Sequence, residues 1–386
     1  MRIAEVKTTA VRVPLREPVK WSGGTRETAP ALIVELYTDE GQVGLGECVG
    51  PTIPVIQAIV EEELRDLLRG ADPLRTEFLV HKLEEHTVNW AEIARYAIAG
   101  LEMALLDLKG KVYGMPVVEL LGGVYRREVE FMGYLFIEPP EVNAQQAVEY
   151  VQQGFRELKV KVGRDLDEDV ARLRAIREAV GPKVKIRVDA NMAWSVPTAI
   201  KTIRRLEPYG LQFVEQPVPW YDREGLAQVR AAVETPIAAD ESCTGLREAL
   251  ALIEKRACDV LVVYVSEAGG LTKAQQIVRL ADAVGMWCVL GTWAELGVGT
   301  IAGVHLVAAS RNFPFANDTH YPLQADDVLP TRLTFVQGKL EVPRRPGLGV
   351  ELDAEKVAYF AQLKARDTVF GDPDDPRFIP RIGQIS

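Results

Sequence analysis

Short runs of apolar and β-branched residues alternate with amphipathic helical stretches along the chain from about Arg127 onward. Strands that alternate with helices of this length imply βαβ units and a parallel sheet. The expected strands cover residues 129–136, 156–162, 184–190, 211–217, 236–242, 259–265 and 287–293. The expected helices between them cover residues 167–180, 196–208, 224–234, 246–257 and 271–285.

Polar side chains stand at or near the carboxyl ends of five successive expected strands. They follow one another at intervals of 24 to 28 residues, as Lys161, Asp189, Glu215, Asp240 and Tyr264. In an open sheet these side chains would spread across its width, whereas in a (β/α)8 barrel they converge on one mouth. No glycine-rich dinucleotide fingerprint follows the first strand, which disfavours a Rossmann fold. We therefore predict an α/β fold with a modified (β/α)8 TIM barrel over residues 126–332.

The beginning and the end of the chain have a different pattern. Residues 31–48 alternate like a hairpin that turns at residues 39–41, and helical stretches follow at residues 55–68 and 97–114. Residues 333–343 alternate again, like a pair of strands. We expect residues 1–125 to form an α+β capping domain, and we expect the segment 333–386 to return to that domain.

The composition is that of a folded protein with a large core, because 47% of the 386 residues are hydrophobic and 26% are charged. A net charge of −10 and the lack of a basic run argue against binding to nucleic acid. No apolar run reaches the length of a membrane span, and the four cysteines have no metal-binding spacing. We expect a cytoplasmic protein with reduced thiols.

Eight short motifs follow one another along the chain. They are GLGEC at 44–48, ALLDLKGKVYGMPVVELLGG at 104–123, KVK at 159–161, VDAN at 188–191, VEQP at 214–217, ADES at 239–242, AGGLT at 268–272 and PGLGVELD at 346–353. Together they resemble the enolase superfamily, and within it the muconate lactonizing enzyme subgroup. The resemblance implies a capping domain over a modified barrel, in agreement with the hydrophobic pattern, and a homo-oligomer that is a dimer or an octamer.

The resemblance implies that Asp189, Glu215 and Asp240 bind a divalent cation. A carbon acid beside a carboxylate is weak, because its ionisation adds a second negative charge to a group that is already anionic. A cation on the carboxylate oxygens offsets that charge. Three carboxylates suit Mg²⁺, which prefers oxygen ligands, and Mn²⁺ is a further possibility. The alternative is that these acids end their strands and pair with nearby lysines.

Lys161 is the candidate base, in agreement with the lysine base of the superfamily. The strand period of two places Lys159 and Lys161 on the same face. The ammonium group of Lys159 favours the neutral form of Lys161, which can then accept a proton near neutral pH. The alternative is that both lysines are solvated on an exposed face.

Tyr264 stands where the family usually carries a second lysine. Racemases and epimerases of this subgroup use acid–base groups on both faces of a planar intermediate. A phenol is a poor base at neutral pH, but it can donate a hydrogen bond or a proton. The substitution therefore favours chemistry served by Lys161 alone, whether Tyr264 acts as a donor or only packs.

Six further side chains are candidates for contact with the substrate or support of the metal site. They are Asn191, Glu295, Asp318, His320, Trp21 and Arg26. The segment WSGGTRE at 21–27 falls where the family has a mobile loop that closes the site, although a plain solvated turn is an alternative. Solvation in a loop is likewise the alternative for Asp318 and His320, whose motif ANDTH departs from the D-x-D of the dipeptide epimerases.

The leading hypothesis is an Mg²⁺-dependent lyase or isomerase that acts on a small carboxylic acid. Lys161 would remove the proton α to the carboxylate and form an enediolate, which would react further by syn elimination or by cycloisomerisation. The first alternative is an amino-acid or hydroxy-acid racemase or epimerase in which Tyr264 replaces the second lysine. The second alternative is a catalytically idle barrel that binds a metabolite.

Overall fold

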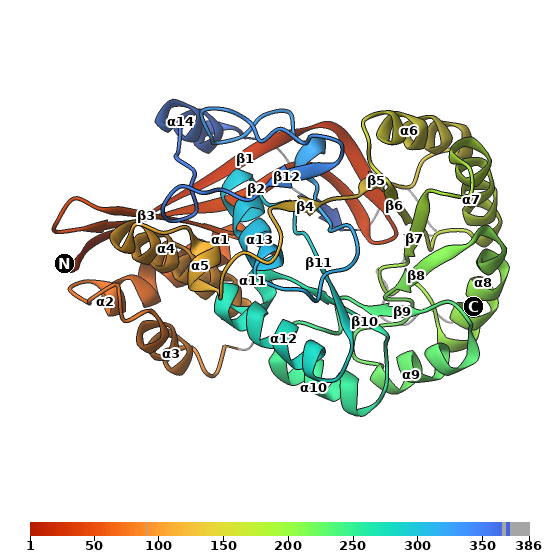
Figure 1. The fold of residues 1–386 in the computed structure, drawn as a ribbon, viewed down its shortest axis with the longest axis horizontal. Helices are drawn as coiled ribbons and strands as arrows, with labels where there is room; N and C mark the ends of the chain where they lie inside the picture. The colour runs from red at the N-terminus through yellow and green to blue at the C-terminus, as the bar shows by residue number, and fades with distance from the viewer. Residues whose placement is uncertain (91, 365–367, 371–386) are drawn as a thin grey trace.

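The computed structural model describes residues 1–90, 92–364 and 368–370. An antiparallel sheet with its helices lies beside a curved parallel sheet that is wrapped by helices on its outer side (Figure 1). The α/β fold class predicted from the sequence is confirmed.

The antiparallel sheet is built mainly from the first 48 residues. It contains β1 (Ile3–Trp21), β2 (Gly24–Thr38), β3 (Val43–Cys48) and, from the end of the chain, β13 (Thr368–Phe370). The turn between β2 and β3 lies at the expected place, and the amide of Thr38 donates to the carbonyl of Gln42. The helices of this part are α1 (Ile53–Ala58), the π-helix η1 (Ile59–Leu64), α2 (Arg65–Leu68), α3 (Thr76–His86), α4 (Ile93–Tyr113) and α5 (Val117–Leu120).

Helix α4 packs directly on β3, and two glycines make this close approach possible. A Cβ atom on Gly46 would lie 2.0 Å from the carbonyl oxygen of Gly100, and one on Gly100 would lie 2.3 Å from the sulfur of Cys48. Both distances are shorter than any van der Waals contact, so only glycine fits here. The glycines of the GLGEC motif therefore have a packing role.

The parallel sheet has seven strands in the order of the sequence. They are β5 (Gly133–Leu135), β6 (Glu157–Lys161), β7 (Lys185–Asp189), β8 (Leu211–Glu215), β9 (Ile237–Ala239), β10 (Val260–Val263) and β11 (Trp287–Leu290). The connecting helices are α6 (Pro140–Gln152), α7 (Leu166–Val180), α8 (Val196–Leu206) with η2 (Glu207–Tyr209), α9 (Arg223–Ala232), α10 (Leu246–Glu254), α11 (Val265–Ala268), α12 (Leu271–Ala283) and α13 (Gly297–Ala308).

The eighth position of the barrel is taken by an irregular segment around Asn317. The Asn317 carbonyl accepts a hydrogen bond from the amide of Met132, and the amide of Asp318 donates to the carbonyl of Leu290 at the end of β11. The segment therefore bonds to the first and the last part of the sheet without forming a regular strand among the described residues.

The first expected strand, at residues 129–136, is wrong as a single element. The structure has two short strands there, β4 (Glu128–Glu130) and β5. β4 pairs with β12 (Lys339–Glu341) rather than with the barrel sheet. The break occurs because Phe131 bonds to the carbonyl of Gly338 while Met132 bonds to Asn317, so that successive residues have different neighbours.

The rest of the chain runs back over the antiparallel sheet. Residues 321–323 form the short helix η3 (Tyr321–Leu323), and the expected strand pair at 333–343 contains one regular strand, β12. α14 (Ala354–Gln362) lies against β1, and β13 pairs with β2. The remainder of the expected C-terminal segment, 365–367 and 371–386, lies outside the described residues.

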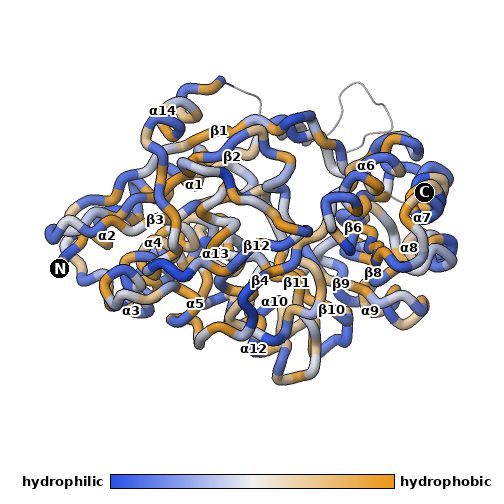
Figure 2. The backbone as a smooth tube through the Cα atoms, turned by 45° about the horizontal axis from the view of Figure 1, so that its top comes forward, coloured by the Kyte–Doolittle hydropathy of each residue, from blue (hydrophilic) through white to orange (hydrophobic). Residues whose placement is uncertain are grey.

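Hydrophobic and hydrophilic residues alternate along the outer helices (Figure 2). In α8 the buried residues are Ala199, Thr202, Ile203 and Leu206, which form one face at helical spacing. All four cysteines are buried and free. Within the described residues, no helix is both long enough and apolar enough to cross a membrane.

Candidate active site

The carboxyl ends of the parallel strands bring acidic side chains together at the mouth of the barrel. Lys161 lies beside Asp189, and Asp189 lies beside Glu215, in the register of β6, β7 and β8. Asp240 directly follows β9. Asp189, Glu215 and Asp240 are buried, and each offers a carboxylate oxygen within 4.8 Å of the others.

The two lysines of β6 point into this group of carboxylates. The Nζ atom of Lys159 lies 2.5 Å from Glu215 Oε1 and 2.6 Å from Asp318 Oδ2. The Nζ atom of Lys161 lies 2.6 Å from Asp189 Oδ2. Both lysines are buried, so they are not the solvated pair that the sequence left as an alternative.

The electrostatics of this site fit a bound cation. Burial raises the pKa of Glu215 and of Asp240 well above the ordinary range, and the negative charge of Asp189 raises both further. Glu215 Oε2 is buried without a hydrogen-bond partner among the described residues. Buried carboxylates with unused oxygens are suitable ligands for a hard divalent ion, which would relieve their mutual repulsion.

The sequence predicted that the pKa of Lys161 is lowered by Lys159, and this prediction is wrong, because the pKa is raised. Burial lowers this pKa, but the adjacent carboxylate of Asp189 and the phenol of Tyr134 outweigh burial and hold it above its ordinary value. The ammonium of Lys159 has a smaller, opposite effect. The carboxylate of Asp189 therefore favours the protonated form of Lys161.

Asn191 connects Lys161 to Glu241 through hydrogen bonds. Its side-chain oxygen accepts from Lys161 Nζ at 2.8 Å, and its side-chain nitrogen donates to Glu241 Oε1 at 3.0 Å. Its backbone adopts a positive φ of 43°, and Gln216, directly after Glu215, has a φ of 35°. A positive φ is uncommon for a residue with a side chain, less so for Asn than for Gln, and residues in this conformation cluster at functional sites.

Tyr264 occupies the opposite wall of the barrel, at the end of β10. Its ring packs against Gly291, where an added Cβ would be 2.2 Å from a ring carbon. Burial raises the pKa of Tyr264 well above its ordinary value, and Asp240 and Glu267 raise it further. The phenol therefore stays protonated at neutral pH.

The hairpin between β1 and β2 reaches the mouth of the barrel from the antiparallel sheet. Ser22 Oγ donates to the carbonyl of Ala190 at 2.9 Å, and Arg26 Nη1 donates to the carbonyl of Trp293 at 2.9 Å. The guanidinium of Arg26 also lies 5.9 Å from the ring of Trp21. The segment 21–26 thus bonds to the loops that follow β7 and β11, and is more than a solvated turn.

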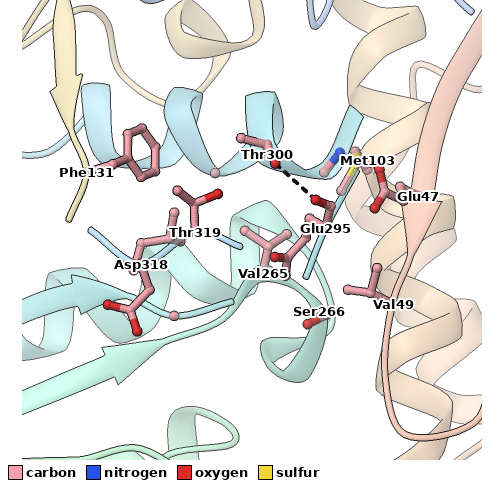
Figure 3. Close-up of a pocket in the computed structure, with 14 residues that line it drawn as sticks. Glu47, Val49, Met103, Phe131, Val265, Ser266, Glu295, Thr300, Asp318 and Thr319 are labelled. Carbon is pink, nitrogen blue, oxygen red and sulfur yellow. Dashed lines mark hydrogen bonds between the residues drawn. The ribbon is translucent and has the colours of Figure 1, made fainter. Parts of the chain in front are cut away.

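Glu295 and Asp318 both line a small pocket (Figure 3). Glu295 accepts hydrogen bonds from Thr292 Oγ1 at 2.5 Å and from the amide of Trp293 at 3.1 Å. The cavity volume of about 20 Å³ has room for one water molecule. This pocket is therefore too small for a carboxylate substrate, and Glu295 is engaged with its own loop.

Several polar residues of the mouth were not found from the sequence. Tyr134 and Arg187 flank Lys159 in the register of β5, β6 and β7, and Arg187 Nη1 lies 3.7 Å from Asp318 Oδ1. Their alternation with apolar neighbours was a usable signal for an inward orientation. Glu267 accepts from Trp293 Nε1 at 2.6 Å, and burial raises its pKa to about 7. No local pattern marked this residue.

Comparison with known proteins agrees with the geometry over nearly the whole chain. Residues 3–122 match the family model of the mandelate racemase / muconate lactonizing enzyme N-terminal domain, and residues 143–357 match the enolase C-terminal domain-like family. L-Ala-D/L-Glu epimerase of Bacillus subtilis (strain 168) is 35% identical, over 91% of this chain and 97% of the epimerase. Muconate cycloisomerase 1 of Rhodococcus opacus is 32% identical, over 92% of this chain and 98% of the cycloisomerase.

Solved structures lead to the same assignment. The structure of N-succinyl Arg/Lys racemase from Bacillus cereus ATCC 14579 has a TM-score of 0.89 and 28% identity, and the match covers 96% of this chain and 100% of the racemase. The fold, the arrangement of the buried acids and the family models agree. This chain belongs to the mandelate racemase/muconate lactonizing enzyme family of the enolase superfamily.

Proposed function

We propose that the protein is an Mg²⁺-dependent enzyme that removes the proton α to a substrate carboxylate and then completes an elimination or a cycloisomerisation with one base. The observation that carries the proposal is the asymmetry of the mouth. An amine, that of Lys161, lies beside the acidic triad on one wall, and a phenol that stays protonated, that of Tyr264, lies on the other.

Asp189, Glu215 and Asp240 are proposed to hold the cation, with Mn²⁺ as a possible substitute for Mg²⁺. Crystal structures of two related dipeptide epimerases contain Mg, which supports this choice. A bound cation supplies Lewis-acid stabilisation to the second negative charge of the enediolate. The unused oxygen of Glu215 and the crowding of three buried carboxylates support the same assignment.

Lys161 is proposed to take the α-proton. Its Nζ atom lies within hydrogen-bond distance of Asp189 and Asn191, so the amine is held next to the proposed metal site. Lys159 is bound between Glu215 and Asp318, and its role is to balance their charge. Lys161 can also return the proton to a leaving group on the same face, which is the requirement for a syn elimination.

Five further residues are proposed to shape the substrate site. Trp21 and Arg26 would cover the mouth from the hairpin, which is supported by the bond from Arg26 to Trp293, and Asp318 and His320 would contact the substrate on the side of the lysines. Glu295 supports the loop that accepts the bond from Arg26. We further propose that the protein is a homo-oligomer, as the resemblance to the family implies.

A racemase or epimerase is the second candidate function. It is favoured by the 35% identity to L-Ala-D/L-Glu epimerase and by the structural match to N-succinyl Arg/Lys racemase. In that case the phenol of Tyr264 would have to exchange a proton with the intermediate from the opposite face. Its raised pKa makes the phenolate rare at neutral pH, which favours the one-base reaction.

The test is proton exchange in D₂O with Mg²⁺, followed by NMR on a panel of acid sugars, hydroxyprolines, N-acylamino acids and muconate-like acids. We expect exchange at the α-carbon with retained configuration, and loss of at least about a thousandfold of this rate in Lys161→Ala. Lys183→Ala, which removes an exposed lysine, is the matched control. Exchange with inversion would establish the second candidate, and metal binding without any exchange would indicate an idle barrel.

A further inference from the structure

Glu267 lies where helix α4 meets the Tyr264 side of the barrel mouth. It belongs to α11, three residues after Tyr264, and α11 packs against α4. The Oε1 atom of Glu267 accepts a hydrogen bond from Trp293 Nε1 at 2.6 Å and lies 3.5 Å from the hydroxyl of Tyr96 on α4. One oxygen of the carboxylate is therefore held by a loop of the barrel and by a helix of the antiparallel part.

The second oxygen of Glu267 is open to a ligand. Glu267 is 6% exposed, and its Oε2 atom makes no hydrogen bond to any of the described residues. A buried polar atom without a partner costs stability. A donor group of a ligand that reaches Oε2 would remove this penalty.

The protein supplies no cation to this carboxylate. Glu267 forms no ion pair with a lysine or an arginine within the described part of the chain. Burial raises its pKa to about 7, the hydrogen bond from Trp293 opposes this shift, and the negative charges of Glu92 and Glu295 raise the pKa further. A positively charged ligand group beside Oε2 would favour the ionised form and would bind it through a charge-assisted hydrogen bond.

The opposite wall of the mouth is balanced in a different way. There the two ammonium groups of β6 each lie within 2.6 Å of a carboxylate oxygen, so the acids of that wall have positive neighbours from the protein itself. On the wall of Glu267 the phenol of Tyr264 stays neutral and offers no positive charge. The charge that balances Glu267 must therefore come from a ligand.

Aromatic rings border the carboxylate of Glu267. The rings of Tyr96 and Trp293 meet edge to face at a centroid distance of 6.0 Å. Trp293 is only partly buried, and it packs against the cluster of barrel residues that contains Tyr264. Aromatic rings attract a cation over their faces. An unpaired carboxylate oxygen beside such rings suits a positively charged nitrogen better than a neutral or an anionic group.

We propose that Glu267 binds a positively charged nitrogen of the substrate, so that the acid on which the enzyme acts also carries an ammonium or a guanidinium group. This inference rests on the function proposed above, and it names the substrate class and the residue that selects it. The carboxylate of the substrate lies at the proposed metal site, and the nitrogen lies at Glu267 Oε2. Glu267 is a specificity-determining residue on the wall opposite Lys161.

The probes are two pairs of acids that differ in charge and little in shape. N-acetylarginine and N-acetylcitrulline differ at the end of the side chain, and alanine and lactate differ on the reacting carbon. An α-ammonium group by itself makes the α-hydrogen more acidic, so dissociation constants from calorimetry with Mg²⁺ are compared instead of rates. We expect the cationic member of at least one pair to bind at least about tenfold more tightly than its neutral partner.

Substitutions of Glu267 separate its charge from its packing. Glu267→Gln keeps an oxygen that accepts from Trp293, so the preference for the cationic acid should fall below about twofold while affinity for the neutral acid changes less than about threefold. Glu267→Asp keeps the charge and should keep part of the preference. Glu254→Gln, exposed at the end of α10, is the matched control for loss of an acid. An unchanged affinity for Mg²⁺ shows that the mouth is intact in each variant.

The outcomes also separate this proposal from the function on which it rests. If neither cationic acid binds more tightly than its neutral partner, or if the preference persists in Glu267→Gln, the proposal is wrong. If the preference depends on Glu267 but no α-proton exchanges with deuterium from the solvent, the binding role stands and the proposed function fails. If α-protons exchange in the wild type without a preference for a cationic acid, α-proton abstraction stands and the binding role fails.

Discussion

Two groups of buried acids among the described residues are satisfied in different ways. Between the antiparallel sheet and the barrel, Glu47 accepts from the amides of Leu296 and Gly299, and Glu102 accepts from the amides of Leu271 and Thr272. These bonds cap the first turns of α13 and α12. We call this set of contacts the seam.

In the mouth of the barrel, by contrast, the acids crowd one another. Glu215 has an oxygen without a partner in the described part of the chain, and Asp189 and Asp240 lie near enough to share an ion with it. The comparison shows that burial of an acid does not by itself indicate function. Fully bonded acids in the seam join two parts of the fold, whereas acids with unused oxygens in the mouth are available for a ligand.

The largest effect that would test this comparison is expected in the seam. Glu102→Ala removes the acceptor of two amides and of Thr272 Oγ1, and we expect it to lower the free energy of unfolding by about 3 kcal/mol. Its affinity for Mg²⁺ should stay near that of the wild type. Urea unfolding and calorimetric titration measure the two quantities, with Glu84→Ala as the half-exposed control.

A parallel loss of metal affinity in Glu102→Ala would contradict the comparison, because it would mean that the contacts of the seam and metal binding in the mouth are energetically coupled. The result would remain informative if the variant unfolds, since Glu102→Gln keeps one acceptor and should show a smaller loss of stability with the same metal affinity.

Substitution of an acid in the mouth should have the opposite effect, because it should weaken stabilisation by the metal without lowering the stability of the metal-free protein. At a hundredfold excess over its dissociation constant, Mg²⁺ should raise the free energy of unfolding of the wild type by about 2.7 kcal/mol. Asp240→Asn should lose most of this increment. Its metal-free form should be no less stable than the metal-free wild type, because one of three crowded carboxylates is removed. Thermal unfolding with and without Mg²⁺ measures both effects, and an unchanged metal increment would show that Asp240 is no ligand.

The effect that is smallest for a single step of one pH unit concerns Glu47. Burial raises the pKa of Glu47 from 4.5 to about 8 in the folded protein, although the amides of Gly299 and Leu296 oppose the shift. The folded state therefore holds this proton to higher pH than the unfolded chain does. The contribution of Glu47 to the free energy of unfolding should therefore fall as pH rises between 4.5 and 8, by at most about 1.4 kcal/mol per pH unit.

The measurement is the free energy of unfolding between pH 5 and pH 8 in saturating Mg²⁺, which keeps the mouth acids ionised. Glu47→Gln should flatten this slope, even though it loses one acceptor for the amides of α13 and is less stable at pH 5. An equal slope in Glu47→Gln and in the wild type would show that Glu47 is ionised throughout.

Much of the architecture could be predicted from local patterns in the sequence. The hairpin of β2 and β3, the alternating strands and helices, and the regular intervals from Lys161 to Asp240 all depend on periods of two or of about 3.6 residues within short segments. Those periods are imposed by the backbone, so one segment reveals them without its neighbours. They also predicted that the polar side chains at the strand ends share one mouth, because the parallel strands of a barrel end on one side.

The tertiary structure decided which of these side chains have partners. The spacing could not show that Asp318 binds Lys159, that Arg26 of the hairpin bonds to Trp293, or that residues 129–136 divide between two sheets. Each of these contacts joins residues that are far apart in sequence or that compete for the same neighbour, so its energy depends on packing rather than on local conformation. The sequence by itself determined the elements and the mouth, and the packing of distant segments determined which buried acids are bonded and which are open to a ligand.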